Sequence, residues 1–138
     1  MMRKNNLFSA ENANEGILHV LFCLAMCVSK DTPPFFGIDN IDTALNPHLC
    51  RTLMKEVCSL AASHKKQLLV TTHNPAILDG LNLNDDDIRL SVVERNQHGQ
   101  TQTRRITVKP EHENIEGKRL KLSELWTKGY IGAISDNF

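Results

Sequence analysis

Apolar residues follow two different spacings along the chain, and each spacing predicts a kind of element. Over residues 14–29 they recur at helical spacing on more than one face, which predicts a largely buried helix. A second helix is predicted from Asn46 to His64, because Asn and Pro are typical of a helix start and a leucine and valine stripe follows. Two short apolar runs, 35–38 and 67–71, predict buried strands, and the first of them lies between a proline and Asp39-Asn40.

The second half of the chain changes to a strand-like alternation. Residues 88–94 and 101–108 alternate apolar and polar positions, and the polar stretch 96–100 between them predicts a hairpin loop. Asn74-Pro75 begins a short helix before this hairpin, and residues 120–128 form an amphipathic helix after it.

The longest apolar stretch, residues 17–28, is too short to span a bilayer. His19 interrupts it, and we expect a satisfied core or interface histidine there rather than a ligand. The amino-terminal residues lack the order of a signal peptide, because acidic and amide residues follow the basic ones. We therefore expect a cytoplasmic chain with no membrane partner.

Composition narrows the class of protein but does not identify a partner. A chain of 138 residues fits one compact domain or part of a larger one. With 41% hydrophobic and 23% charged residues it is an ordinary globular sequence, which excludes collagen and coiled coils. Sixteen basic residues balance sixteen acidic ones, so charge gives no case for nucleic acid as the main partner. The locally basic last third is more simply a solvated face.

The four cysteines lack the spacing of metal ligands. No CxxC occurs, and Cys23 and Cys27 are one helical turn apart, as residues of one apolar helix face would be. We predict that all four are small buried hydrophobic residues in a reducing compartment.

The order strand, helix, strand over residues 35–71 is a βαβ unit, which joins two parallel strands. Ligands bind beyond the carboxyl ends of such strands. Asp39 and Asp42 follow the first strand, and His73 follows the second. A strand-end carboxylate suits a Mg²⁺–nucleotide site with a histidine near the terminal phosphate. The pattern alone leaves open that Asp39 caps a turn and that His73 is an ordinary loop histidine.

Four short motifs in this order resemble those of ABC-type ATPase heads, and most closely the SMC-like and OLD-like branch of AAA-family ATP-binding proteins. In that family they are the signature motif, Walker B, the D-loop and the switch histidine. Here they read Asn14-Glu15-Gly16, Phe35-Phe36-Gly37-Ile38-Asp39, Ala44-Leu45-Asn46-Pro47 and Thr71-Thr72-His73-Asn74-Pro75. The fold that this resemblance implies is α/β: a partial P-loop NTPase sheet with flanking helices and a carboxyl-terminal β-hairpin.

The resemblance divides the chain into segments of one unit, the carboxyl-terminal lobe of an ATPase head over residues 1–138. Residues 1–30 are the signature-like segment and its helix, and residues 34–80 hold Walker B, the D-loop and the switch. Residues 88–108 are the hairpin, and residues 118–138 are the last helix and the tail.

The resemblance also implies roles for single residues. Asp39 would hold Mg²⁺ through water, and His73 would contact the γ-phosphate of ATP. Asn14 and Gly16 would meet the γ-phosphate bound by the opposite subunit, where a helix amino terminus favours anionic charge. Asn46 would lie in the D-loop, which crosses the dimer interface.

Two departures from the family pattern change these expectations. No GxxxxGK[ST] occurs in the sequence, so the phosphate-binding loop is expected from a missing amino-terminal Walker A lobe or from a second chain. The isolated chain would then bind ATP poorly and be inactive. Asn40 stands where the family has a catalytic Glu. Since an amide cannot accept a proton as a carboxylate does, hydrolysis should be slow or Asp42 must substitute.

The function that follows from the resemblance is ATP binding and slow hydrolysis in a head-to-head homodimer. A nuclease partner or DNA, and a role in phage defence or genome maintenance, are implied by the same resemblance. One alternative is a non-catalytic dimerisation or regulatory module derived from such an ATPase. Another is a small nuclease that uses Asp39, Asp42 and a metal, which we rank last because it leaves His73 and the signature-like helix unexplained.

Overall fold

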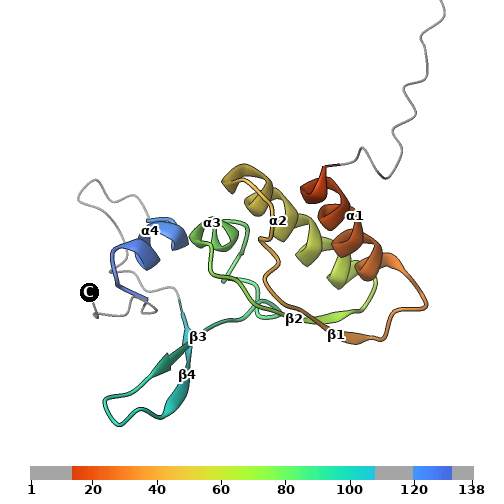
Figure 1. Cartoon of the computed structure of the whole chain (residues 1–138). Coiled ribbons are helices and arrows are strands. Elements are labelled where there is room, and N and C mark those ends of the chain that lie inside the picture. The colour runs from red at the N-terminus through yellow and green to blue at the C-terminus, as the bar shows by residue number, and fades with distance from the viewer. Residues whose placement is uncertain (1–13, 108–119, 132–138) are drawn as a thin grey trace, which may run out of the picture.

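The computed structural model describes residues 14–107 and 120–131, which form an α/β arrangement of four helices and four strands (Figure 1). Predictions that concern residues 1–13, 108–119 and 132–138 lie outside the described residues. The elements in chain order are α1 (Glu15–Val28), β1 (Phe35–Ile38), α2 (Pro47–Ser63), β2 (Gln67–Val70), α3 (Pro75–Leu78), β3 (Leu90–Arg95), β4 (Thr101–Ile106) and α4 (Leu122–Thr127).

Asparagine side chains fix the start of the first three helices. The Asn14 Oδ1 atom accepts a hydrogen bond from the Gly16 amide at 2.8 Å, and Asn46 and Asn74 cap α2 and α3 in the same way. Such caps satisfy amides that have no partner inside the helix. The predicted starts at Asn46-Pro47 and Asn74-Pro75 are therefore confirmed. None of the described helices is long and apolar enough to cross a bilayer.

The predicted βαβ unit is confirmed as well. Strands β1 and β2 pair in parallel, with Ile38 opposite Val70, and α2 makes the crossover between them. Figure 1 shows α1 and α2 side by side on one side of these strands. The core between the helices and the sheet includes Phe36, Ile38, Leu53 and Val57.

The prediction of buried strands is wrong for one face of this sheet. Burial alternates along β1, and Phe35 remains 57% exposed. On β2 the exposed position is Leu69, at 64%. Only the helices α1 and α2 cover the sheet, so the residues of the opposite face have no cover among the described residues. Both faces of a parallel sheet are normally covered.

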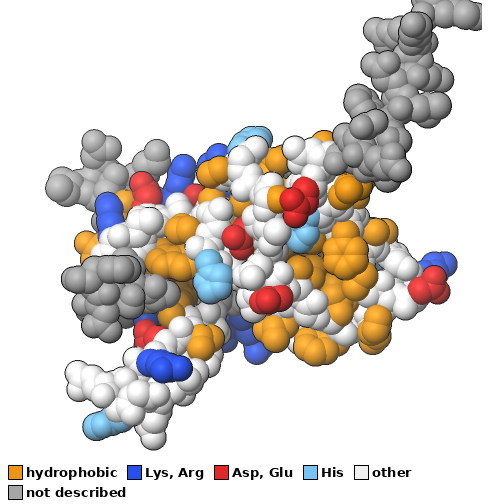
Figure 2. Space-filling model, viewed as in Figure 1, with side chains coloured by type: hydrophobic (Ala, Val, Ile, Leu, Met, Phe, Trp, Pro, Cys, Tyr) orange, Lys and Arg blue, Asp and Glu red, His pale blue; other side chains and the backbone are white. Residues whose placement is uncertain are grey.

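The prediction that α1 is largely buried is also wrong. Only Gly16, Cys23 and Cys27 of this helix are buried, and they face α2 and the sheet. Ile17, Leu18, Leu21 and Phe22 lie on the opposite side and are each between 43% and 57% exposed. Figure 2 shows hydrophobic side chains gathered over α1 and β1.

The carboxyl-terminal half has a small core of its own. Strands β3 and β4 pair antiparallel in a separate two-stranded sheet, so the predicted hairpin is confirmed and it flanks the parallel sheet without extending it. Its apolar side chains pack with α3 and α4 in a cluster formed by Leu78, Val92, Ile106, Leu125 and Ile131.

The prediction of buried cysteines is confirmed for three of the four. Cys23, Cys27 and Cys50 are buried and Cys58 is half-buried, and all four are free thiols. Within the described residues no three histidine, cysteine or acidic side chains are grouped in a way that could hold a metal ion. Burial raises the pKa of the Cys23 thiol to about 11, and the neighbouring Cys27 acts in the same direction.

Candidate functional site

The loops that follow β1 and β2 lie together at the carboxyl edge of the parallel sheet. Two backbone hydrogen bonds extend the pairing beyond the strands: the Thr71 amide donates to the Ile38 carbonyl at 3.0 Å, and the Ile41 amide donates to the Thr71 carbonyl at 3.1 Å. The loop that carries Asp39 and the loop that carries His73 are therefore held in register.

Asp39 is the first residue of the β1 exit loop, and its carboxylate is held from the neighbouring strand. The Thr71 hydroxyl donates a hydrogen bond to Asp39 Oδ1 and accepts one from the Asn40 amide at 2.9 Å. Asp39 is solvent-exposed, so its other oxygen is open to a ligand. A rigidly held carboxylate that faces water fits a hydrated Mg²⁺, which prefers oxygen ligands.

Asn40 has a left-handed backbone conformation, with φ of 48°. Asparagine is among the few residues that adopt this conformation at low cost, and most others are strained by 1–2 kcal/mol or so. The residue is exposed, and its side chain is a carboxamide, which is no general base. Local backbone geometry is therefore one physical reason for an asparagine at this position.

Asp42 is half-buried and is tied to the other loop. The Thr72 hydroxyl donates to Asp42 Oδ1 at 2.6 Å and accepts a hydrogen bond from the Asn74 amide at 3.0 Å. His73 lies between Thr72 and Asn74 in sequence and is solvent-exposed. The Asp42 carboxylate thus stabilises the loop that presents His73, and one of its oxygens is already engaged.

The start of α1 rests on the loop after β1. Gly16 is buried, and a Cβ atom at this position would lie 2.7 Å from the Ala44 carbonyl oxygen. Ala44 itself has a left-handed φ of 60°. Two residues further along the same loop, Asn46 begins α2. The start of α1 therefore packs against the loop that joins β1 to α2, and the two segments form one surface.

Two of the predicted site residues use their polar atoms within this surface. The Gly16 amide donates to Asn14 Oδ1, so Asn14 would contact an external anion through its side-chain nitrogen instead. The Asn46 side chain accepts a hydrogen bond from the Leu49 amide at 3.0 Å, which is the N-cap bond of α2. The structure thus gives both asparagines a definite role in starting a helix.

Three polar contacts of this site were not predicted from the sequence. The hydroxyls of Thr71 and Thr72 hold the two aspartates, and His19 Nε2 lies 2.9 Å from the Ile41 carbonyl oxygen. The contact of His19 agrees with the prediction of a satisfied histidine. For the threonines the available signal was their place at the end of the second strand, directly beside the aspartate loop.

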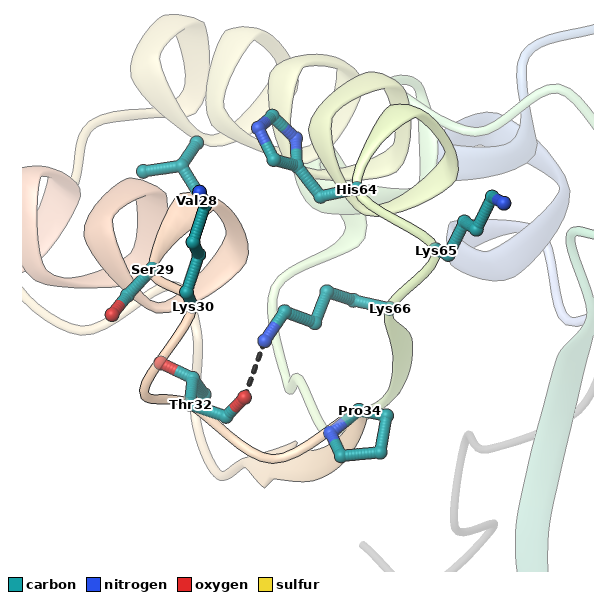
Figure 3. A pocket seen from close by; sticks show the side chains of 8 residues that line it. All are labelled: Val28, Ser29, Lys30, Thr32, Pro34, His64, Lys65 and Lys66. Atoms are coloured by element: carbon teal, nitrogen blue, oxygen red, sulfur yellow. Dashed lines mark hydrogen bonds between the residues drawn. The ribbon is translucent and has the colours of Figure 1, made fainter.

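A cavity of about 300 Å³ lies at the other end of the strands (Figure 3). Its lining includes Lys66, which precedes β2, and Pro34, which precedes β1. In Figure 3 the Lys66 ammonium group points across the opening and donates to the Thr32 carbonyl, whereas Lys65 points away. This lysine secures the turn before β1, and the cavity is not part of the carboxyl-edge site.

One comparison with known proteins gives a match. A family model described as "AAA domain, putative AbiEii toxin, Type IV TA system" matches residues 3–79. The match therefore covers more than half of the 138 residues, including both exit loops and the start of α1. No curated protein and no solved structure matches the chain.

Proposed function

The chain belongs to this family of AAA-type P-loop ATPases, and on that basis we propose that it binds ATP with Mg²⁺ and hydrolyses it slowly within a dimerising SMC-like or OLD-like head. The observation that carries the proposal is the meeting of the Asp39 and His73 loops at one edge of a parallel sheet. A carboxylate for the metal and an imidazole for the terminal phosphate are the groups that such a site needs.

Asp39 is the residue that would hold Mg²⁺, through water molecules, and His73 would orient the γ-phosphate. The bound metal would neutralise charge on the phosphates, and the carboxyl edge would present ATP to both loops. Asp39 fits this role because its carboxylate is fixed by Thr71 on one side and exposed on the other.

Slow turnover is part of the proposal because no free carboxylate follows Asp39 directly. Asn40 cannot accept a proton, and Asp42 is engaged by the Thr72 hydroxyl. ATP would then serve mainly to hold two heads together, with Asn14 and Gly16 near the phosphate of the opposite subunit and Asn46 near the dimer interface.

We further propose that the phosphate-binding loop comes from polypeptide outside this sequence, either in line with it or on a second chain. The printed sequence contains no GxxxxGK[ST]. The uncovered sheet face around Phe35 and Leu69, together with the outer side of α1, supplies an apolar surface of the kind that another lobe covers. A nuclease partner, DNA contact and a role in phage defence are further proposals that rest on the resemblance alone.

The test is nucleotide binding with and without a Walker A lobe. We would read the DNA in frame upstream of the Met1 codon, express the chain with the GxxxxGK[ST] segment found there or in a neighbouring gene, and titrate a fluorescent ATP analogue with Mg²⁺. We expect weak binding by the 138-residue chain alone and binding at least ten times tighter by the complete head. Asp39→Asn should abolish the Mg²⁺ dependence, whereas Asp31→Asn, an exposed loop aspartate before β1, is the matched control. Equal binding by the chain with and without the lobe would contradict the proposal.

A non-catalytic dimerisation module is the second candidate, and Asn40 is the observation that favours it. The two candidates differ in turnover by the complete head. Slow hydrolysis that increases in an Asn40→Glu variant supports the ATPase, because a carboxylate is restored at the position of the base. Nucleotide-dependent dimerisation without turnover, in both the original head and this variant, supports the module.

A further inference from the structure

The two loops of the carboxyl edge are joined by a repeated hydrogen-bonding pattern. Thr71 and Thr72 are consecutive, and each uses its hydroxyl hydrogen to hold one aspartate of the opposite loop. Each also uses its hydroxyl oxygen to accept one backbone amide, that of Asn40 for Thr71 and that of Asn74 for Thr72. A hydroxyl group has one hydrogen and two lone pairs, so each threonine can donate to its aspartate and accept the amide at the same time. The Thr72 hydroxyl oxygen also lies 3.5 Å from the Asn74 carbonyl oxygen, farther than from Asp42 Oδ1 at 2.6 Å, so the aspartate is the better acceptor.

The two threonines serve different parts of the site. The Thr71 hydroxyl contacts Asp39 and Asn40, the first two residues of the β1 exit loop. Thr72 joins Asp42, at the middle of that loop, to the amide that directly follows His73. The first contact therefore fixes the direction of the Asp39 carboxylate, and the second fixes the backbone on either side of His73.

We propose that Thr71 and Thr72 are separate positioning residues, Thr71 for the carboxylate of Asp39 and Thr72, through Asp42, for the loop that carries His73. Asp42 is in this assignment a partner of Thr72 and not a substitute base. This assignment rests on the proposed function, because it says which residues orient the proposed metal ligand, Asp39, and the histidine, His73. Its geometry, however, is measurable in the chain without any nucleotide.

The experiment uses the isotope-labelled 138-residue chain and four variants: Thr71→Val, Thr71→Ser, Thr72→Val and Thr72→Ser. Nuclear magnetic resonance reports the side-chain carboxyl carbon of each aspartate and the exchange rate of each amide. In Thr71→Val we expect the Asp39 carboxyl resonance to move and the Asn40 amide to exchange about tenfold faster. Thr72→Val should do the same to Asp42 and Asn74, and should shift the His73 ring signals.

Each valine variant should leave the other pair unchanged, and each serine variant should restore the original signals because it keeps the hydroxyl. The assignment is overturned if both valine variants change the same signals, or if serine does not restore them. Should a valine variant fail to fold, Asp39→Asn and Asp42→Asn give the same comparison, because removing either carboxylate charge should change the signals of its own threonine alone. Failure of the proposed function would instead appear as absent nucleotide binding by the complete head, with these signals unaffected.

Discussion

Replacing Gly16 with alanine tests whether the start of α1 and the loop after β1 form one surface. An alanine in a helix normally stabilises it relative to glycine, by up to about 1 kcal/mol. At this position the new Cβ atom would lie 2.7 Å from the Ala44 carbonyl oxygen, 3.1 Å from Asn14 Oδ1 and 3.3 Å from a Leu45 methyl carbon. Ordinary van der Waals contact begins at 3.4 Å, so the Ala44 backbone would have to move.

The expected result is a net loss of stability. Inserting a carbon into a filled site costs about 1–3 kcal/mol, and here the nearest neighbour is backbone that already has a left-handed φ. Subtracting a helix gain of up to about 1 kcal/mol leaves a destabilisation of about 0–2 kcal/mol. The assay is urea unfolding of the 138-residue chain, measured by circular dichroism. We expect the variant and the original chain to have the same dependence of the free energy of unfolding on urea concentration.

Gly37→Ala, in strand β1, is the control substitution. A Cβ atom there would meet only the Leu69 carbonyl oxygen, at 3.6 Å, which is an ordinary contact. We expect this variant to unfold at the same urea concentration as the original chain or a slightly higher one. A Gly16→Ala chain as stable as the Gly37→Ala chain would refute the close approach of α1 to Ala44.

Three further outcomes follow from the structure. Stability against urea should fall between about pH 9 and 11, because the folded state keeps the Cys23 proton that the unfolded chain loses. A flat profile in this range would contradict the raised pKa of this thiol. Asn40→Gly should leave the free energy of unfolding nearly unchanged, whereas Asn40→Val should lower it by about 1–2 kcal/mol, because the backbone at residue 40 has a φ of 48°. Equal free energies of unfolding for the two variants would contradict this strain. The Leu125 side chain is only 2% exposed, so Leu125→Ala should lower the free energy of unfolding by about 2–5 kcal/mol. It should also speed amide exchange in the β3–β4 hairpin more than in β1 and β2, and an equal acceleration in both sheets would contradict a separate second core.

Local signals in the sequence were sufficient to predict most of the elements. Asn46-Pro47 and Asn74-Pro75 each combine a capping side chain with a residue suited to the first helical turn, and both start helices where expected. The apolar run of β1 is bounded by Pro34 before it and by Asp39-Asn40 after it. These features act over a few residues, so a single sequence contains them.

Exposure and side-chain partners could not be predicted in the same way. Periodicity identifies Leu69 as an apolar strand residue, but whether another element covers it depends on segments distant in sequence. The hydrogen bonds of Thr71 and Thr72 depend on the register that places Ile38 opposite Val70, and local sequence signals do not specify that register. The family match covers residues 3–79, and the contacts between the two exit loops come from the fold.

The exposed apolar side chains of α1 and the absence of a GxxxxGK[ST] motif from the sequence support the same proposal. Ile17, Leu18, Leu21 and Phe22 are each about half exposed, and fully burying one such side chain is worth about 1.5–3 kcal/mol. Covering the four would therefore stabilise the fold by about 4 kcal/mol, which is a large part of the stability of a small domain. A helix that is apolar on every side is characteristic of a helix inside a larger core. A lobe that brought the phosphate-binding loop to Asp39 and also covered α1 would meet both requirements at once, so nucleotide binding and stability of this chain should rise together when that lobe is supplied.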